Sequence, residues 1–346
     1  MSSDIKQRKA DHLDLCATDD VEFRDRSTLL ECVRLMHQSL PDLAFDDIDT
    51  RVRLLGKDLR APIVIAAMTG GHERAADINQ ALASIAEAKG YAFGLGSQRA
   101  MQKRPDTSWT YQVREVAPSA LVFGNVGVVQ ARDMTTASIA EMVGEVGADA
   151  LCVHMNPAME LVQPEGDRDF RGGLDTFRRL ASDLAVPVIA KETGNGVSRE
   201  AATSLLGVGV RHVDTSGAGG TSWVGVETMR AEGASRAIGE ALWDWGIPTA
   251  ASVHYCASAG MTTIATGGIR SGLDVARSIA LGAECAGIAR VVYQAFLDGG
   301  TKGAESYLEG VERELRSVML LCGARSLADL RRAPRVISGE LKDWIA

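Results

Sequence analysis

The stretch ADALCVHMNPAMELVQPEGD, residues 148–167, contains both parts of the pattern that decides the fold. Residues 150–153 form a short apolar run, which predicts a buried β-strand. Pro157 and Pro164 then exclude a continuing central strand and a regular helix, so we expect the chain to leave the sheet here as a loop.

Apolar runs of this kind recur along the chain and alternate with helix-length segments rich in Ala, Glu and Arg. Strands that are apolar on both faces and alternate with helices form parallel sheets, and eight of them favour a closed barrel. The sequence therefore predicts an α/β fold, a single (β/α)8 TIM barrel. We expect its strands at residues 63–67, 92–95, 121–124, 150–153, 188–190, 212–214, 263–265 and 286–289, and helices at 74–89, 136–146, 174–184, 198–207 and 272–281.

The segments outside this repeat divide a single domain into an N-terminal extension over residues 1–60, the barrel over 61–296 and a helical tail over 297–346. The main insertion, residues 223–260, separates the sixth and seventh strands. Within the extension, apolar spacing predicts a helix over residues 28–36. The charged residues near the terminus suggest a solvated tail by position, or else a flap over an anion.

Composition narrows the class of protein. The 346 residues carry a formal net charge of -8, which does not suggest a partner such as nucleic acid or an anionic membrane. The six cysteines include no CxxC pair, which indicates reduced thiols in a cytoplasmic protein. Neither a signal peptide nor an apolar membrane span is evident, so we expect a cytoplasmic location.

Polar or glycine-rich clusters follow nearly every predicted strand. His154 and Asn156 are one such cluster, and their spacing of two points both side chains the same way. An isolated His-x-Asn more often marks a solvated loop. The recurrence of such clusters at one rim of the barrel, where enzymes of this fold place their active sites, favours a functional site instead.

Glycine turns after the last two predicted strands indicate a phosphate site, because backbone N–H groups can approach the phosphate there. Lys191 ends the fifth strand, where it could stabilise negative charge on a reduced flavin or form a salt bridge with Glu192 or another carboxylate. No strand-linked GxGxxG opens a helix, so FMN fits better than a dinucleotide. Candidate cofactor residues are Ala67, Met68, Thr69, Ser97, Asn125, Lys191, Ser216, Thr221, Gly267, Gly268, Arg270, Ala289 and Arg290.

A second group of mostly cationic residues is left unexplained by the cofactor, and a polyanionic substrate would account for it. The group comprises Arg8, Lys9, His12, Ser97, Arg99 and His154. Glu160 could then bind a Mg²⁺ ion that neutralises a diphosphate, because Mg²⁺ often takes one or two carboxylates together with phosphate oxygens.

Several motifs, in this order, resemble those of the type 2 isopentenyl diphosphate isomerase family. They are Arg-Lys-x-Asp-His near the N-terminus, Met-Thr-Gly-Gly, Gly-Ser-Gln-Arg, His-x-Asn-Pro, Gln-Pro-Glu-Gly-Asp, Lys-Glu-x-Gly, Gly-Gly-Thr-Ser-Trp, Trp-Gly-x-Pro-Thr and Gly-Gly-Ile-Arg. The match runs from about Arg8 to about Arg290. The resemblance implies an FMN-dependent barrel enzyme that interconverts isopentenyl and dimethylallyl diphosphate. It also implies Mg²⁺, a reduced flavin supplied by NADPH or another reductant, and a homo-oligomer such as a tetramer or octamer.

By this resemblance the candidate residues receive roles. Glu160 would bind the metal, and the catalytic group would comprise His154, Asn156, Met159 and Lys191. The prenyl diphosphate would be held by Arg8, Lys9, His12, Ser97, Arg99, His154, Asn156 and Gln163.

The sequence departs from the family pattern just before the metal residue. The family has a Gln there that is implicated in proton transfer, whereas this chain has Met159, and Ala158 replaces a larger aliphatic residue. A thioether cannot relay a proton, so we expect Ala158 and Met159 to form a roomier, more apolar wall at the alkene end.

Three alternatives follow for the function. One is a relative that acts on a longer or modified prenyl diphosphate, and another is an FMN-binding protein without turnover. A 2-hydroxy-acid oxidase is disfavoured, because it would need a His base beside an Arg clamp late in the barrel, and His254 lies in the helix-like insertion.

Overall fold

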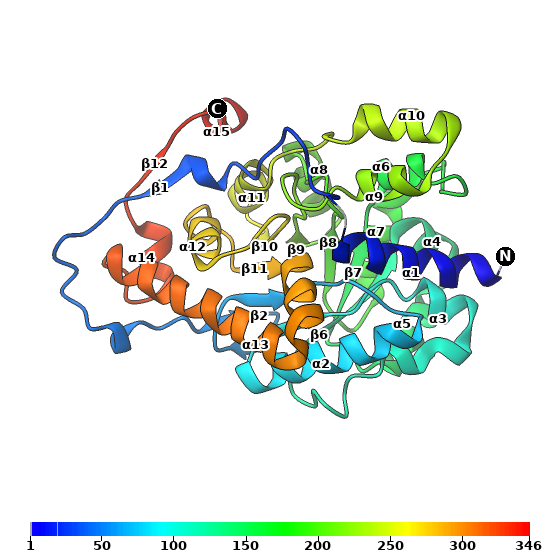
Figure 1. Ribbon diagram of the computed structural model, residues 1–346, viewed down its shortest axis with the longest axis horizontal. Coiled ribbons are helices and arrows are strands. Elements are labelled where there is room, and N and C mark those ends of the chain that lie inside the picture. Colours follow the sequence, from blue (N-terminus) through cyan, green and yellow to red (C-terminus); the bar gives the residue numbers. More distant parts are fainter. Residues whose placement is uncertain (1, 19) are drawn as a thin grey trace.

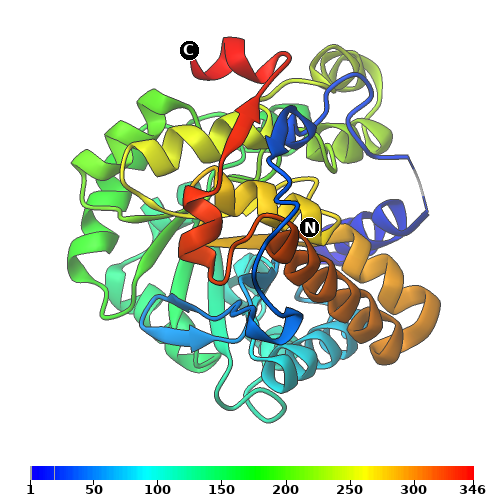
Figure 2. The same cartoon turned by 90° about the vertical axis from the view of Figure 1, so that its left-hand side faces the viewer.

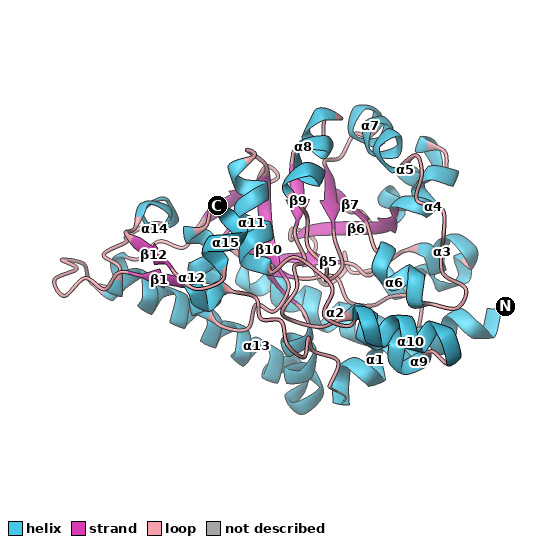
Figure 3. Ribbon diagram, turned by 90° about the horizontal axis from the view of Figure 1, so that it is seen from above, coloured by secondary structure: helices cyan, strands magenta, loops and turns pink. Residues whose placement is uncertain are grey.

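The computed structural model describes residues 2–18 and 20–346, and its centre is a closed barrel of eight parallel strands. Helices surround the strands on the outside (Figure 3). All eight expected strands are confirmed, and with them the TIM-barrel fold. The barrel strands, in sequence order, are β4 (Ile63–Ile65), β5 (Ala92–Gly94), β6 (Leu121–Gly127), β7 (Ala150–His154), β8 (Val188–Lys191), β9 (His212–Asp214), β10 (Thr262–Thr266) and β11 (Cys285–Ile288).

The strand register aligns the polar residues at one rim. His154 of β7 pairs in register with Lys191 of β8, which in turn pairs with Asp214 of β9. Because neighbouring parallel strands end at the same edge, these three side chains meet at the C-terminal mouth of the barrel.

The expected outer helices are also present. Most of them begin at side-chain caps such as Ser198 and Ser271, whose hydroxyls accept backbone N–H groups. Their bounds are α2 (Glu73–Lys89), α5 (Thr136–Glu145), α7 (Gly173–Asp183), α8 (Arg199–Gly207) and α12 (Gly272–Ala280).

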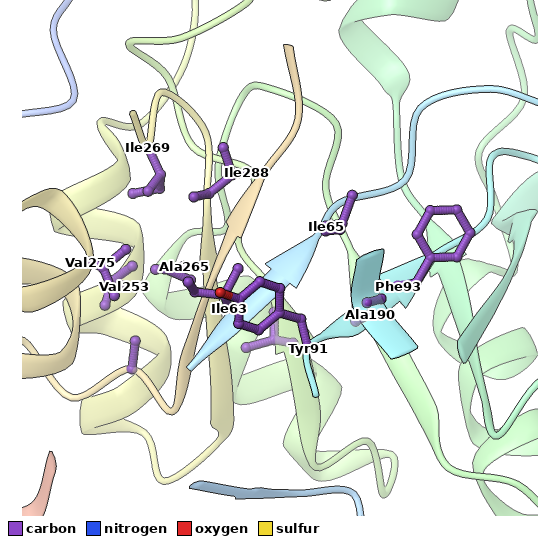
Figure 4. Packing of buried hydrophobic residues seen from close by; sticks show 14 of the residues in the cluster. Ile63, Ile65, Tyr91, Phe93, Ala190, Val253, Ala265, Ile269, Val275 and Ile288 are labelled. Carbon is purple, nitrogen blue, oxygen red and sulfur yellow. The ribbon is translucent and has the colours of Figure 1, made fainter. Parts of the chain in front are cut away.

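The apolar core has two parts. One lies between strands and outer helices and includes Ile63, Tyr91 and Phe93 (Figure 4). The other fills the inside of the barrel and includes Leu54 and Leu59 from the hairpin of β2 (Val52–Leu54) and β3 (Lys57–Leu59). Since this interior is packed with side chains, a ligand site is expected at the barrel mouth.

The tail interpretation of the N-terminal charges is wrong. Residues Ser2–Thr18 form a helix, α1, that contacts α9 (Trp223–Arg230) and α13 (Arg290–Leu321) (Figure 1). Arg8, Lys9 and His12 are each only partly exposed. Position along the chain misled here, because the contacts that fix α1 come from residues far along the chain.

The helix expected over residues 28–36 is also wrong. A short 3₁₀ turn, η1 (Leu30–Cys32), leads into strand β1 (Val33–Leu35), and β1 pairs antiparallel with β12 (Arg335–Ile337) from the C-terminal tail (Figure 2). Leu29 has a positive φ of 56°, which interrupts any helix before it can extend. Long-range strand pairing therefore overrides the local apolar spacing.

The C-terminal tail contains more than α13. After that helix follow α14 (Leu327–Arg332), the strand β12 and α15 (Leu341–Ile345).

None of the helices in the described part of the chain is long and apolar enough to cross a membrane. All six cysteines are free thiols.

Two further segments shape the mouth of the barrel. The insertion folds as α9, α10 (Gly233–Leu242) and α11 (Thr249–Ser258).

The expectation of an irregular loop after β7 is wrong in part, because residues Pro157–Val162 form a short helix, α6. Pro157 occupies its first turn, where a proline costs no hydrogen bond. Helix α6 packs on α9 and α10.

Candidate functional site

One cavity opens at the C-terminal mouth of the barrel, and every candidate site residue proposed from the sequence lines it. The strand ends supply most of the lining, and α1, α3 (Arg99–Lys103) and α6 supply the rest. These lining residues are Arg8, Lys9, His12, Ala67, Met68, Thr69, Ser97, Arg99, Asn125, His154, Asn156, Met159, Glu160, Gln163, Lys191, Ser216, Thr221, Gly267, Gly268, Arg270, Ala289 and Arg290.

The deepest polar group of the site, which we call the floor, consists of Asn125, His154, Lys191, Asp214 and Ser216. Lys191 Nζ donates to Ser216 Oγ at 2.6 Å and to the Glu192 carbonyl at 3.0 Å, and it lies 3.2 Å from Asp214 Oδ2. The sequence left open whether Lys191 pairs with Glu192 or with another carboxylate. The structure shows that its ion-pair partner is Asp214. Lys191 is therefore half of a buried ion pair and is not a free cation.

His154 occupies the floor next to Asn125. Its Nδ1 lies 2.8 Å from Asn125 Oδ1, while Asn125 Nδ2 donates to the Leu95 carbonyl. The Asn125 oxygen must therefore accept, which places the proton of the neutral ring on Nδ1. Burial, together with the charges of Lys191, Lys9 and Arg99, lowers the pKa of His154 to about 3. The ring is thus neutral at physiological pH.

Opposite this floor lies a group of cations that we call the cationic wall: Arg8 and Lys9 from α1, and Arg99 from α3. The buried Nε atoms of Arg8 and Arg99 have no hydrogen-bond partner. Burial and the charges of Arg8 and Arg99 lower the pKa of Lys9 to about 8. Arg99 Nη1 also lies 4.0 Å from Asp167 Oδ2, a long ion pair. Cations that repel one another and keep unbonded donors form a site that suits an anion.

Helix α1 is held in place by an ion-pair network. His12 Nε2 lies 2.8 Å from Oε1 of Glu227, which is fully buried, and Arg230 bonds both Glu227 and Asp11. The His12 ring also packs edge-on against Trp223, with ring centroids 5.2 Å apart. These contacts fix the position of Arg8 and Lys9 over the cavity.

Glu160 is the candidate metal residue, and it faces the cationic wall. Asn156 Nδ2 donates to its Oε1 at 2.9 Å, and the Asp167 backbone N–H donates to Oε2 at 2.8 Å. The described residues contain no cluster of three or more side chains able to hold a metal ion. Each carboxylate oxygen of Glu160 keeps a further lone pair, so Glu160 could bind a Mg²⁺ ion that takes its other ligands from phosphate and water.

The backbone of the glycine turns and two nearby threonine hydroxyls suit a bound flavin mononucleotide. Gly267 and Gly268 have φ values of 105° and 69°, a region that favours glycine. The buried hydroxyls of Thr69 and Thr266, which line the same cavity, have no hydrogen-bond partner. A cofactor with several polar ring atoms would supply those partners.

Ala158 does not take part in the wall of the cavity. It packs with Val162, Val224 and Ala231 in a small core between α6 and the insertion. Met159, the next residue on α6, turns into the cavity instead. The expectation that Ala158 enlarges the alkene end is therefore wrong, because neighbouring helical residues face different sides.

Sequence reasoning missed several residues of the site. The apolar pattern marks Asp214 only as the end of a strand, although a charged residue closing an apolar run is a usable signal. Glu227 and Gln130 give none, because their partners His12 and Asp167 are distant in the chain. Glu192 enters the sequence argument only as a partner for Lys191.

The true role of Glu192 is to organise the loop after β8. Its Oε2 accepts the backbone N–H groups of residues 193–196 at 2.5–3.2 Å. Burial raises the pKa of Glu192 to about 7, against the opposing effect of these hydrogen bonds. Thr193 and Gly194 of this loop line the cavity, so the carboxyl group shapes one of its sides.

Comparison with known proteins gives consistent matches over the whole chain. The protein-family model described as FMN-dependent dehydrogenase matches residues 1–238 and 169–337. Isopentenyl-diphosphate delta-isomerase of Methanothermobacter thermautotrophicus is 44% identical over 344 residues, which cover 99% of this chain and 96% of the relative. The protein of that name from a Nostoc species is 42% identical and covers 96% of each chain.

Solved structures support the fold alone. A mandelate oxidase variant with a monooxide FMN adduct aligns with a TM-score of 0.67 at 17% identity, over 94% of this chain and 95% of that one. Mandelate oxidase with (S)-2-phenylpropionate aligns with a TM-score of 0.64 at 18% identity, over 97% and 98% of the two chains.

Proposed function

Because the chain belongs to the isopentenyl-diphosphate delta-isomerase family and matches the FMN-dependent dehydrogenase model, we propose that it is an FMN-dependent isomerase of isopentenyl and dimethylallyl diphosphate. The cationic wall, with unbonded donors at the Nε atoms of Arg8 and Arg99, is the observation that carries this proposal. A diphosphate brings several anionic oxygens to Arg8, Lys9 and Arg99, and it relieves their mutual repulsion.

Substrate binding would also involve the residues around the wall. His12, Ser97, Asn156 and Gln163 line the same cavity and carry groups that can bond phosphate oxygens. Glu160 would hold Mg²⁺ between itself and the diphosphate, where the ion offsets the repulsion between carboxylate and phosphate.

His154 has a distinct part in this proposal. In the free protein Asn125 holds its Nδ1 proton, which leaves Nε2 as the nitrogen that can accept one. A bound anion favours the charged ring, so His154 would take up a proton as the diphosphate binds. The charge-assisted bond formed in this way would help to orient the substrate.

The cofactor would lie against the remaining strand ends. The glycine turns with Arg270, Ala289 and Arg290 would bind its phosphate. Its ring would be contacted by Thr69, Asn125, Lys191, Ser216 and Thr221. Bound FMN in its reduced form would supply the acid and base that move the substrate proton.

A second candidate, action on a longer prenyl diphosphate, is favoured by one residue. Met159 turns an apolar side chain into the cavity, with its Sδ 3.8 Å from Asn156 Nδ2. Such a surface suits hydrocarbon better than proton relay. His254, the base considered for an oxidase, lies in α11 and outside the residues that line the cavity.

Further parts of the proposal concern the whole protein. We propose one FMN-binding unit with an extension at 1–60, a barrel at 61–296 and a tail at 297–346. It would act in the cytoplasm as a homo-oligomer, a tetramer or octamer, with NADPH or another reductant reducing the flavin. Gel filtration with light scattering measures the oligomer, and a monomer would exclude that part.

The test of the function is an assay of the purified protein with FMN, a reductant, Mg²⁺ and a panel of prenyl diphosphates. We expect a yellow protein that releases FMN on denaturation and interconverts the two five-carbon diphosphates. A colourless protein that takes up no added FMN contradicts the proposal. Turnover only of a longer homologue supports the second candidate, and flavin binding without turnover of any member of the panel indicates a binding protein.

A further inference from the structure

A short segment of the N-terminal extension, residues 21–24, crosses the cavity mouth beside the glycine turns, and we call it the strap. It forms an antiparallel bridge with the rim loop between Glu22 and Thr221. Phe23 N donates to the Gly220 carbonyl at 3.0 Å, and Ser222 N donates to the Val21 carbonyl at 2.7 Å. The strap is thus part of the rim and lies on the loop that follows β9.

Glu22 turns from this strap into the cavity, where its carboxylate joins two arginines. Oε1 lies 2.9 Å from Arg290 Nη1, and Oε2 lies 2.8 Å from Arg270 Nη2. These arginines follow β11 and β10, the two strands that carry the proposed phosphate turns. Arg290 is also fixed from α1, because its Nε donates to the Cys16 carbonyl at 2.9 Å.

The chain just after the strap packs directly on the glycines of the site. A Cβ atom on Gly219 would lie 2.1 Å from the Thr28 backbone nitrogen. One on Gly268 would lie 2.4 Å from Thr28 Cγ2 and 2.7 Å from the Gly219 carbonyl oxygen. Because these glycines have no side chains, the extension can pack against the turns. For the same reason a phosphate can approach them.

A carboxylate at a phosphate site has to be explained, because it repels the ligand. Both oxygens of the Glu22 carboxylate are paired with guanidinium groups, which offset its charge. Each guanidinium has five N–H donors, more than its pair with Glu22 uses. We propose that Glu22 is a positioning residue for the cofactor, whose ion pairs with Arg270 and Arg290 hold the strap closed over the FMN phosphate and slow the release of FMN. This rests on the proposed function, since it requires FMN at the glycine turns.

The experiment measures the release of FMN from the holoprotein by the rise in flavin fluorescence after dilution. Glu22→Gln keeps the size of the side chain but removes the charge that both arginines bind. At low salt we expect this variant to release FMN three to ten times faster than the unmodified protein, the order expected for partly exposed ion pairs that act together.

Glu240→Gln is the matched control. Arg24 of the same strap pairs with Glu240 at 2.7 Å, an exposed contact on α10 and outside the residues that line the cavity. This variant loses an ion pair of the strap without touching Arg270 or Arg290. Its release of FMN should equal that of the unmodified protein, and equal acceleration in both variants would overturn a specific role for Glu22.

A second measurement needs no variant. Salt screens partly exposed ion pairs, so release from the unmodified protein should accelerate between about 0.05 and 0.5 M NaCl, while release from Glu22→Gln should respond less. Slower release from Glu22→Gln would mean that Glu22 competes with the phosphate, and unchanged release with no salt response would mean that the strap does not control exit. Either result overturns the proposal while FMN binding itself, and with it the proposed function, stands.

Discussion

The floor and the cationic wall face one cavity but differ in how their charges are satisfied. On the floor, Lys191 pairs with Asp214 and His154 bonds Asn125. On the wall, the Nε atoms of Arg8 and Arg99 lack hydrogen-bond partners. Arg99 has only a long ion pair, 4.0 Å from Nη1 to Asp167 Oδ2. The charges of the floor are therefore satisfied without a ligand, whereas the wall keeps donors for an anion.

The difference follows from where the residues are attached. Floor residues stand on adjacent barrel strands, whose register holds them at bonding distance. Wall residues lie on α1 and α3, outside the sheet. No strand register brings them to bonding distance of one another, so their donors can point towards a ligand. Changes in the wall should therefore alter substrate affinity, and changes in the floor should alter stability.

The largest effect is expected at Met159, on the helix that borders the wall. If the substrate is the five-carbon diphosphate, Met159→Gln should raise the turnover rate by about 10²–10⁴-fold, the contribution of a positioned acid or base. If the chain acts on a longer substrate, the same change should cost ~1–3 kcal/mol by placing an amide against hydrocarbon. Turnover on both substrates, side by side, separates these cases.

Leu161→Gln provides the control, because Leu161 is an exposed residue of the same helix. It should leave turnover unchanged on either substrate. If the unmodified protein already works at the rate of relatives that carry Gln, and Met159→Gln adds nothing, the residue has no part in proton transfer.

The next effect concerns the wall itself. Lys9→Ala and Arg99→Ala should each weaken diphosphate binding by ~1.5–3 kcal/mol, the range for a charge-assisted bond to a desolvated anion. Calorimetric titration with isopentenyl diphosphate measures this loss. Lys103→Ala, at the exposed end of the helix that carries Arg99, should bind normally. Normal binding by the Lys9 and Arg99 variants would remove both residues from the site.

A smaller effect is expected on stability, from His154. Its pKa is lowered to about 3 in the folded protein, so below pH 6.5 the unfolded chain binds a proton that the folded one does not. The contribution of neutral His154 to the free energy of unfolding should be complete above pH 6.5 and should be lost as the pH drops towards 3. At pH 5 the loss should be about 2 kcal/mol. Urea unfolding of the protein and of His154→Asn at pH 8 and pH 5 tests this.

His154→Asn should lose less stability between these two pH values than the unmodified protein. The exposed residue His37 supplies the control, and His37→Asn should follow the unmodified protein. Identical pH dependence in all three proteins would show that folding does not lower the pKa of His154.

The smallest effect concerns the pH profile of the wall. Since the pKa of Lys9 is lowered to about 8, the free protein loses this cation as the pH rises through 8. kcat/KM should then fall by up to about tenfold per pH unit above 8, because it reports groups of the free enzyme. Lys9→Arg should remove the fall, since arginine stays charged. A fall that persists in Lys9→Arg belongs to another group.

The sequence by itself determined the barrel and the content of its mouth. Short runs that are apolar on both faces can be buried only in a parallel sheet covered by helices, and residues that follow such runs must meet at one rim. For this reason the sequence alone assigns residues as far apart as Thr69 and Arg290 to one cavity, and both line it.

Only the tertiary structure decided which partners those residues have. His12 and Glu227 are 215 positions apart, β1 pairs with a strand from the C-terminal tail, and Glu22 reaches arginines of the last two barrel strands. Local patterns report periodicity over a few residues and contain no information on contacts at this separation. Helix α1 therefore resembles a solvated tail in its sequence, although packing against α9 and α13 makes it one side of the site.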